Sequence, residues 1–177
     1  MKYSLWICPP ESSLPFVLLD TLLSDTSKAL STERFAPHVT LFSPVLADND
    51  EDVVDQVCKY AKALAPGGIH VDIASLTTGS KYYQCMLLEA MRSDSLLAAN
   101  KAARQYWNAQ SQPLFNPHVS VVYGKLAGEE LSNAEALVRS MLPKDPQQLS
   151  FVAKEIHIVM TVGSCNQWYI AGRVPID

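Results

Sequence analysis

The sequence predicts an α+β fold in which two pseudo-symmetric lobes of mainly antiparallel sheet, with outer helices, surround a central cleft. Short strand patterns alternate with amphipathic helix patterns along the chain. Apolar residues make up 48% and charged residues 18% of the 177 residues, which is enough for a packed core. The order of elements in the first half returns after a shift of 80 residues. We therefore expect residues 1–177 to form a single bilobal domain that arose by internal duplication.

The first half of the chain supplies the elements of one lobe. Residues 3–8 read as a strand that Pro9 and Pro10 end, and residues 13–30 read as a helix with leucines on one face. A strand at 38–42 precedes a helix at 50–64, which has acidic residues at its positive end and lysines near its negative end.

Two further strand candidates, at 69–77 and 81–89, flank a turn at 78–80 and predict a hairpin. The second half then repeats the order of the first. The remaining predicted elements are a helix at 93–107, a strand at 118–123, a helix at 132–142 that begins with a capping box of Ser132 and Glu135, and strands at 155–161 and 168–174.

Charge and cysteine usage narrow the functional class. The 14 Lys and Arg against 18 Asp and Glu give a net charge of −4, which argues against binding of a long nucleic acid but not of a single nucleotide. The four cysteines form no Cys-x-x-Cys pair, no apolar signal segment follows Met1, and the apolar stretch at 14–23 is too short to span a bilayer. We expect a monomeric cytoplasmic protein without membrane contact.

The sharpest local feature is a repeated hexapeptide. Residues 35–40 read FAPHVT and residues 115–120 read FNPHVS, with four identities and a Thr/Ser exchange at the same 80-residue spacing. Side chains alternate across a strand, so His38 and Thr40 share one face, and His118 and Ser120 share the corresponding face of the second lobe. If a pseudo-twofold axis relates the lobes, two imidazoles and two hydroxyls converge on one spot.

This combination suits the hydrolysis of a phosphodiester. One neutral histidine takes a proton from water while a protonated one gives a proton to the leaving oxygen. The hydroxyls donate hydrogen bonds to the non-bridging phosphate oxygens.

Two other interpretations of the hexapeptides compete with this one. They also read as ordinary core strands that each begin with a hydrogen-bonded histidine, but the duplication of the pair argues against this. A metal site lacks a third ligand, because no His-Glu-x-x-His, His-x-His or Cys/His cluster is present. The familiar glycine-rich phosphate loops are absent as well. We expect neither a metal nor a cofactor.

Each hexapeptide contains a His-x-Thr or His-x-Ser motif, His38 to Thr40 and His118 to Ser120, which we call the two tetrads. The paired tetrads resemble the signature of the two-histidine (2H) phosphoesterase superfamily. Within it the chain is most similar to the plant and fungal cyclic phosphodiesterases, through residues 3–6 with Pro9, and residues 35–41, 78–85 and 117–123. The resemblance implies metal-independent hydrolysis of ADP-ribose 1″,2″-cyclic phosphate to the 1″-phosphate, and of nucleoside 2′,3′-cyclic phosphates to 2′-phosphates. The implied setting is the clearance of by-products of tRNA splicing.

The resemblance also implies a role for each site residue. His118 would activate the water, His38 would protonate the leaving ribose oxygen, and Thr40 and Ser120 would hold the phosphate. Tyr123 matches a family site residue, although strict alternation sends it to the other face; a bend at Gly124 would bring the phenol round. Plant members use disulfides here, but only Cys85 matches a familiar position, so no bridge is transferred.

Other aromatic and histidine residues have less specific signals. Trp6 lies on a strand beside the expected cleft, where its indole can stack on a nucleobase. For Tyr82 and Tyr83 core packing is favoured. His70 and His157 are not followed two positions later by a Ser or Thr, as His38 and His118 are. We expect both to be structural or surface residues.

Two rival functions remain open. One is an RNA-end enzyme of the same superfamily, either a 2′,5′-ligase/hydrolase or a uridine-trimming 3′ exonuclease, which needs a basic groove that the acidic composition does not favour. The other is a nucleotide-binding module that has lost its chemistry. The expected partner is a small nucleotide that carries a cyclic phosphate.

Overall fold

The computed structural model describes residues 1–176 and contains a large sheet, a small sheet and four α-helices within that range. In chain order the elements are β1 (Lys2–Ile7), α1 (Leu14–Leu30), β2 (Val39–Leu46), α2 (Asp50–Ala61), β3 (Ile69–Val71), β4 (Ile73–Thr78), η1 (Tyr82–Gln84), β5 (Met86–Ala90), α3 (Asp94–Tyr106), β6 (His118–Val122), α4 (Gly128–Met141), η2 (Pro146–Leu149), β7 (Phe151–Ala153), β8 (Glu155–Met160), η3 (Cys165–Gln167) and β9 (Tyr169–Pro175).

The large sheet has the strand order β4-β5-β6-β2-β1-β8-β9, and all of its recorded pairs are antiparallel. Its two halves meet where β2 pairs with β6 at Val39 and Val119, directly beside the two histidines. Strands β3 and β7 form the small sheet. The predicted α+β class with a mainly antiparallel sheet is confirmed; the internal duplication stays a prediction.

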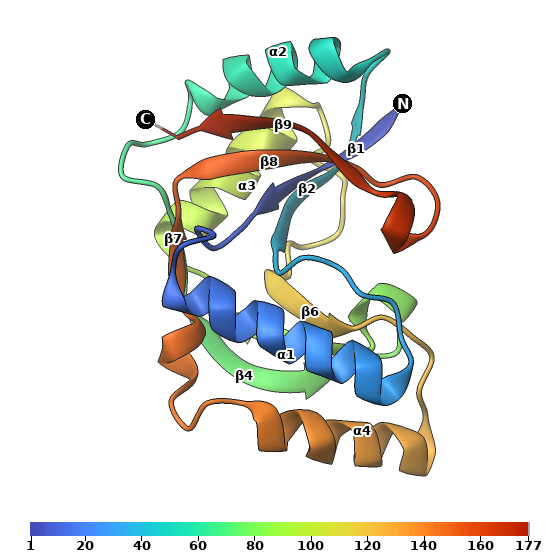
Figure 1. Cartoon of the computed structure of the whole chain (residues 1–177). Coiled ribbons are helices and arrows are strands. Elements are labelled where there is room, and N and C mark those ends of the chain that lie inside the picture. Colours follow the sequence, from blue (N-terminus) through green and yellow to red (C-terminus); the bar gives the residue numbers. More distant parts are fainter. Residues whose placement is uncertain (177) are drawn as a thin grey trace.

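Helices α1 and α3 each pack on the half of the sheet opposite to the one that holds the strand before them in the chain. In Figure 1, α2 and α3 lie in the upper half with β1, β2, β8 and β9, whereas α1 and α4 lie in the lower half with β6 and β4. Helix α1 therefore follows β1 in the chain but packs on β6, and α3 follows β5 but packs on β2. The Asn100 side-chain amide of α3 donates to the Leu41 carbonyl of β2 at 2.7 Å and fixes this contact.

Alternation along β1 separates the core from the cleft. Tyr3, Leu5 and Ile7 are fully buried in the main hydrophobic core, and Leu5 and Ile7 each contribute about 1.5 to 3 kcal/mol by leaving water. Ser4 and Trp6 point to the opposite side of the strand and line the cleft. The pattern of the strand thus sets which side chains reach the site.

The predicted hairpin is correct in its pairing but wrong in its turn. Strands β4 and β5 pair antiparallel, yet the turn runs from Gly79 to Cys85 because the Gly79 N–H donates to the Cys85 carbonyl at 3.0 Å around η1. Strand β5 therefore begins at Met86 rather than at 81. The long strand predicted at 69–77 is divided, and its first part, β3, pairs with β7.

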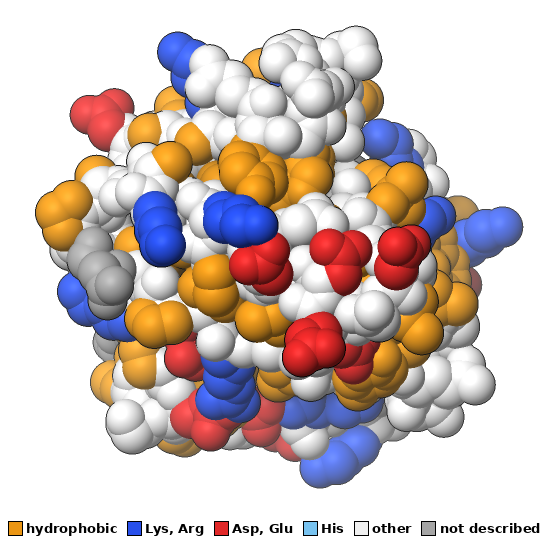
Figure 2. Space-filling view, turned by 90° about the horizontal axis from the view of Figure 1, so that it is seen from above, with side chains coloured by type: hydrophobic (Ala, Val, Ile, Leu, Met, Phe, Trp, Pro, Cys, Tyr) orange, Lys and Arg blue, Asp and Glu red, His pale blue; other side chains and the backbone are white. Residues whose placement is uncertain are grey.

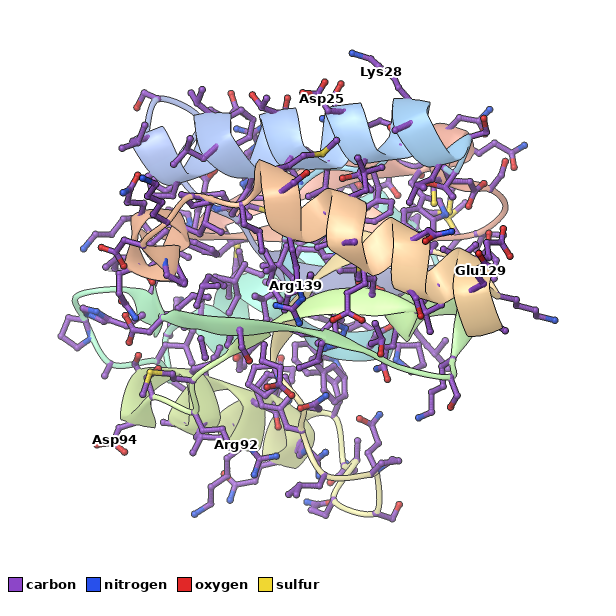
Figure 3. The ribbon with its side chains drawn as sticks, turned by 90° about the horizontal axis from the view of Figure 1, so that it is seen from below. Asp25, Lys28, Arg92, Asp94, Glu129 and Arg139 are labelled. Atoms are coloured by element: carbon purple, nitrogen blue, oxygen red, sulfur yellow. The ribbon has the colours of Figure 1, made fainter. Side chains whose placement is uncertain are left out.

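The capping box of Ser132 and Glu135 is also wrong. Helix α4 begins four residues earlier, at Gly128, and its N-cap Ala127 makes no side-chain bond. Ser132 instead donates to the Gly128 carbonyl at 3.2 Å, and Glu135 accepts from Arg139 at 2.6 Å. Arg139 also donates to the Leu76 carbonyl, so it ties α4 to β4. Figure 3 shows Arg139 pointing from α4 toward the sheet.

The negative charge of the protein lies on its outer surface. Helix α2 carries Asp50, Glu51 and Asp52 in its first turn, and acidic side chains gather on the face seen from above in Figure 2. Within residues 1–176 no helix has the length and apolar character needed to cross a bilayer.

Candidate active site

A cleft of about 720 Å³ opens where the two halves of the sheet meet. Its walls come from β1, β2 and β6, from the loops that precede β2 and β6, and from parts of η1, α3 and the segment after β8. All of the predicted site residues line it, namely Trp6, His38, Thr40, His118, Ser120 and Tyr123.

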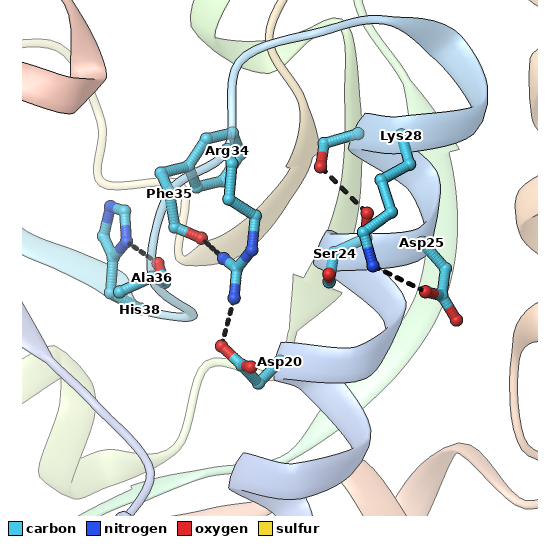
Figure 4. Close-up of polar contacts among 9 residues, drawn as sticks. Asp20, Ser24, Asp25, Lys28, Arg34, Phe35, Ala36 and His38 are labelled. Carbon is cyan, nitrogen blue, oxygen red and sulfur yellow. Dashed lines mark hydrogen bonds and ion pairs between the residues drawn. The ribbon is translucent and has the colours of Figure 1, made fainter.

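The two histidines are held in the same way. Each follows a proline at the entrance to its strand, and each has Nδ1 at 2.7 Å from the carbonyl oxygen two residues earlier, that of Ala36 for His38 and of Asn116 for His118. Figure 4 shows the bond from His38 to Ala36. A carbonyl only accepts, so Nδ1 carries the hydrogen and Nε2 remains available for proton transfer.

An arginine supports the backbone before each histidine. The Arg34 guanidinium donates to the Phe35 carbonyl and to the Asp20 carboxylate (Figure 4). In the other half, Arg92 donates to the Phe115 carbonyl at 2.6 Å. These charge-assisted bonds fix the peptides that lead to the histidines.

Trp6 stacks on the imidazole of His38. The ring centroids are 3.5 Å apart and the planes differ by 8°, while the edge of Trp168 packs against the indole. Only 6% of Trp6 is exposed, so the indole offers little open surface to a nucleobase. The indole packs against the His38 ring, and stacking of Trp6 on a nucleobase stays a prediction.

The two predicted hydroxyls both reach the cleft. Thr40 pairs with Trp6 across β1 and β2, and its side chain is half-buried. Ser120 is buried, and its hydroxyl donates to the Tyr83 carbonyl at 2.9 Å. Rotation of that hydrogen would redirect it to a ligand in the cleft, since a hydroxyl hydrogen turns toward the better acceptor.

Tyr123 reaches the cleft because β6 ends at Val122. The alternation stops there, and the next residue, Gly124, donates its N–H to the Tyr82 carbonyl at 2.9 Å. The Tyr123 ring stacks on Phe35 at 3.8 Å between centroids. Burial raises the pKa of the Tyr123 phenol, so the phenol keeps its hydrogen at neutral pH and can donate it.

Burial also controls the two imidazoles. Desolvation lowers the pKa of His38 to about 4, against the opposing effect of its bond to the Ala36 carbonyl, and the neighbouring charges of His118 and His157 lower it further. Desolvation lowers the pKa of His118 as well, again opposed by its backbone bond. Burial therefore favours the neutral form of both imidazoles.

The cleft is positive although the protein is acidic. Its lining includes Lys2, Lys81 and Arg104 but no Asp or Glu among the described residues. Such a lining attracts an anionic ligand. Between residues 1 and 176 no three His, Cys, Asp or Glu side chains come close enough together to hold a metal ion.

Some of the other aromatic and histidine residues had no clear sequence signal, or a misleading one. Tyr82 and Tyr83 are 37% and 55% exposed, so their predicted core packing is wrong, because η1 carries them out of β5. Trp168 lines the cleft although it belongs to no repeated motif. His157 is buried and bonded to Glu155 at 2.7 Å, and His70 is exposed; neither lines the cleft.

Comparison with known proteins assigns the chain to a family. The sequence model of the cyclic phosphodiesterase-like proteins matches residues 1–176. The chain belongs to this family. The predicted membership of the 2H phosphoesterase superfamily and the predicted class, a hydrolase of phosphodiesters, are thereby confirmed.

Two curated proteins are similar in sequence. The cyclic phosphodiesterase of Arabidopsis thaliana is 27% identical over 137 residues, which cover 75% of this chain and 71% of that protein. The 2′,3′-cyclic-nucleotide 3′-phosphodiesterase of Yarrowia lipolytica is 30% identical over 109 residues, which cover 59% of this chain and 50% of that protein.

Solved structures show the same fold. E. coli LigT in complex with 3′-AMP matches with a TM-score of 0.60 at 12% identity, covering 99% of this chain and 95% of LigT. The protein TT0787 of Thermus thermophilus matches with a TM-score of 0.62 at 12% identity, covering 99% of this chain and 98% of that one. The bilobal α+β architecture is thus shared across chains with little sequence in common.

Proposed function

We propose that the protein is a metal-independent cyclic phosphodiesterase that hydrolyses ADP-ribose 1″,2″-cyclic phosphate to ADP-ribose 1″-phosphate and nucleoside 2′,3′-cyclic phosphates to 2′-phosphates. The observation that carries this proposal is the matched pair of imidazoles. His38 and His118 have their Nδ1 atoms tied to backbone carbonyls, and both line one positive cleft with the hydroxyls of Thr40 and Ser120. By-products of tRNA splicing are the proposed physiological source of the substrate.

In the proposed reaction one histidine accepts a proton from water and the other donates a proton to the leaving oxygen. His118 takes a proton from water at Nε2 while the water oxygen attacks phosphorus. The bond from phosphorus to the ribose 3′ oxygen of a nucleoside 2′,3′-cyclic phosphate breaks, and His38 gives its Nε2 proton to that oxygen, which leaves the 2′-phosphate. Thr40, Ser120 and Tyr123 donate hydrogen bonds to the non-bridging oxygens, whose charge must be stabilised in the transition state.

His38 must be charged to act as the acid, although burial lowers its pKa to about 4. An anionic phosphate beside Nε2 favours the imidazolium, because an opposite charge within a few ångströms raises the pKa of a histidine. The indole stacked on the ring adds a favourable cation–π contact to the charged form. Substrate binding is therefore coupled to proton uptake at His38.

The alternatives receive less support. A polynucleotide-processing enzyme needs a long basic groove, whereas the positive lining here belongs to one confined cleft on an acidic protein. A binding module without chemistry does not require both imidazoles and both hydroxyls, and their joint presence in the cleft favours an enzyme. The proposal includes a small nucleotide as the only ligand, a monomeric state and a cytoplasmic location.

The test is product identification by phosphorus NMR with both substrate classes in the presence of EDTA. His38→Ala and His118→Ala should each lower turnover by about 100-fold to 10,000-fold, the usual effect of a positioned general acid or base. The control is His70→Ala, which removes an exposed histidine outside the cleft and should leave turnover unchanged. Turnover stopped by EDTA and restored by a divalent cation would overturn the metal-independent mechanism.

The pH profile assigns the two roles. The rate should follow a bell against pH, and the variant that lacks the base should lose the acid-side limb. If His38→Ala rather than His118→Ala removes that limb, the roles of acid and base are exchanged while the two-histidine mechanism stands. Near-normal turnover in either alanine variant would refute the mechanism itself.

A further inference from the structure

The carboxylate of Glu33, on the loop before β2, accepts hydrogen bonds from two other segments of the chain. Its Oε1 accepts from the Cys165 N–H at 3.4 Å, and its Oε2 accepts from the Cys165 thiol at 3.1 Å and from the Tyr82 hydroxyl at 3.4 Å. No Lys, Arg or His side chain of residues 1–176 lies within 4 Å of this carboxylate. Neutral donors, and not a surface ion pair, therefore hold it in place. We call Glu33, Tyr82 and Cys165 the Glu33 clasp.

The Glu33 clasp joins the two halves of the large sheet. Cys165 lies in η3, between β8 and β9, and Tyr82 lies in η1, between β4 and β5. These two strand pairs stand at opposite ends of the sheet. Within the sheet itself the halves are joined where Val39 of β2 pairs with Val119 of β6. The clasp therefore provides a further link between the halves that carry the two histidines.

The same three segments supply aromatic rings that enclose Tyr123. Phe35, from the loop that carries Glu33, stacks on the Tyr123 ring at 3.8 Å between centroids. Tyr83, from η1, meets it edge-on at 5.1 Å, and Trp168, which follows η3, lies at 6.3 Å. Only 5% of Tyr123 is exposed. The orientation of its phenol thus depends on three rings whose segments the Glu33 clasp holds together.

The thiol of Cys165 is suited to this bond. Burial, together with the hydrogen bond to Glu33 and its charge, raises the pKa of the Cys165 thiol to about 12. The thiol therefore keeps its hydrogen at neutral pH and donates it to the carboxylate. A bond to an ionised acceptor is stronger than one between neutral groups, so a single carboxylate can hold both segments.

We propose that Glu33 is a positioning residue for Tyr123: its carboxylate draws together the three segments whose rings enclose the phenol, and so holds the Tyr123 hydroxyl toward the phosphate in the cleft. This inference rests on the proposed function, in which Tyr123 donates to a non-bridging oxygen. It goes beyond that function by giving a role to a side chain that does not line the cleft. The effect of Glu33 on the reaction passes through Tyr123.

The test is a double-mutant cycle on kcat/KM for adenosine 2′,3′-cyclic phosphate. Tyr123→Phe should lower kcat/KM about 100-fold, as loss of a transition-state donor does, and Glu33→Ala about tenfold, because it misplaces that donor. In the Tyr123→Phe protein, Glu33→Ala should cost nothing further, since residues that act through one group are not additive. Cys165→Ser keeps a donor and should lie closer to the wild type than Cys165→Ala.

The packing around Tyr123 is also measured without substrate. NMR contacts between the ring protons of Tyr123 and those of Phe35 and Trp168 should weaken in Glu33→Ala. If Glu33→Ala does not fold, Glu33→Gln, which keeps the length of the side chain and removes its charge, takes its place in both measurements. Glu11→Ala is the matched control, because Glu11 is an exposed glutamate paired with Arg173 outside the cleft lining; it should change neither readout.

The outcomes separate this inference from the proposed function. An equal loss from Glu33→Ala in both backgrounds, a normal kcat/KM in Glu33→Ala or in Tyr123→Phe, or unchanged ring contacts would each refute the positioning role. If the wild-type protein hydrolyses no cyclic phosphate, the proposed function fails. The ring contacts then still decide whether Glu33 holds Tyr123 in place.

Discussion

Replacing Trp6 by leucine should lower the pKa of His38. The indole and the imidazole are nearly parallel at 3.5 Å, a distance at which the electron-rich indole stabilises the charged imidazole more than the neutral one. Leucine keeps this position apolar and buried, so the desolvation that already holds the pKa near 4 remains while the aromatic face is lost.

The contact sets the size of the effect. A desolvated cation–π pair contributes about 0.5 to 2 kcal/mol, and one pKa unit corresponds to about 1.36 kcal/mol. The pKa of His38 should therefore fall by about 0.4 to 1.5 units in Trp6→Leu. With adenosine 2′-monophosphate bound, the whole titration lies at higher pH, because the phosphate raises the pKa in both proteins.

The assay is the titration of the His38 ring proton by NMR, with and without adenosine 2′-monophosphate. Trp6→Phe is the control, since it retains an aromatic face and should retain part of the effect. An unchanged midpoint in Trp6→Leu would refute the electrostatic role of the stack. An equal fall in Trp6→Phe and Trp6→Leu would show that the packing of the indole, rather than its π-system, sets the pKa.

Three further outcomes follow from the geometry. Because the folded pKa of His38 is about 4 and the unfolded value about 6.5, the folded state binds fewer protons in that window, and stability falls as pH falls. Urea unfolding should show a loss of about 2 kcal/mol from this group between pH 7 and pH 4.5, absent in His38→Gln. Thr40→Ala should cost up to about 3 kcal/mol in kcat/KM with normal far-UV circular dichroism; an unchanged kcat/KM would remove it from the phosphate site. Arg92→Gln should destabilise the protein by about 1 kcal/mol, lower kcat more than it changes KM, and be partly restored by Arg92→Lys; a change in KM alone would contradict positioning of His118.

The tetrads could be read from the sequence because their information is local. A histidine and a hydroxyl two positions apart on one strand must share a face, and the duplicated spacing places the second pair opposite the first. His38, Thr40, His118 and Ser120 accordingly line one cleft. The support of each imidazole was not predictable in this way, because Trp6 reaches His38 across a strand pair rather than along the chain.

The sequence predictions are wrong or incomplete where the alternating pattern of a strand ends. Tyr82 and Tyr83 stand just before the apolar residues of β5, which favours core packing, but the hydrogen bond from the Gly79 N–H to the Cys85 carbonyl makes that stretch a turn. Tyr123 escapes alternation because β6 stops one residue before it. Strand β7 has only three residues, and its partner β3 lies far away in the sequence, so no local sequence pattern predicts it.

The exchange of helices between the halves has a consequence for how the protein can be divided. A cut between β5 and α3 yields two fragments, each of which keeps one of the two cleft histidines. The first fragment holds α1 without β6 to cover, and the second holds α3 without β2, so each exposes an apolar face that only the other fragment can cover. Neither fragment has a complete core by itself, and assembly of the two restores both cores and the cleft in one step. The hydrolytic activity of such a divided chain therefore reports whether its two parts have met.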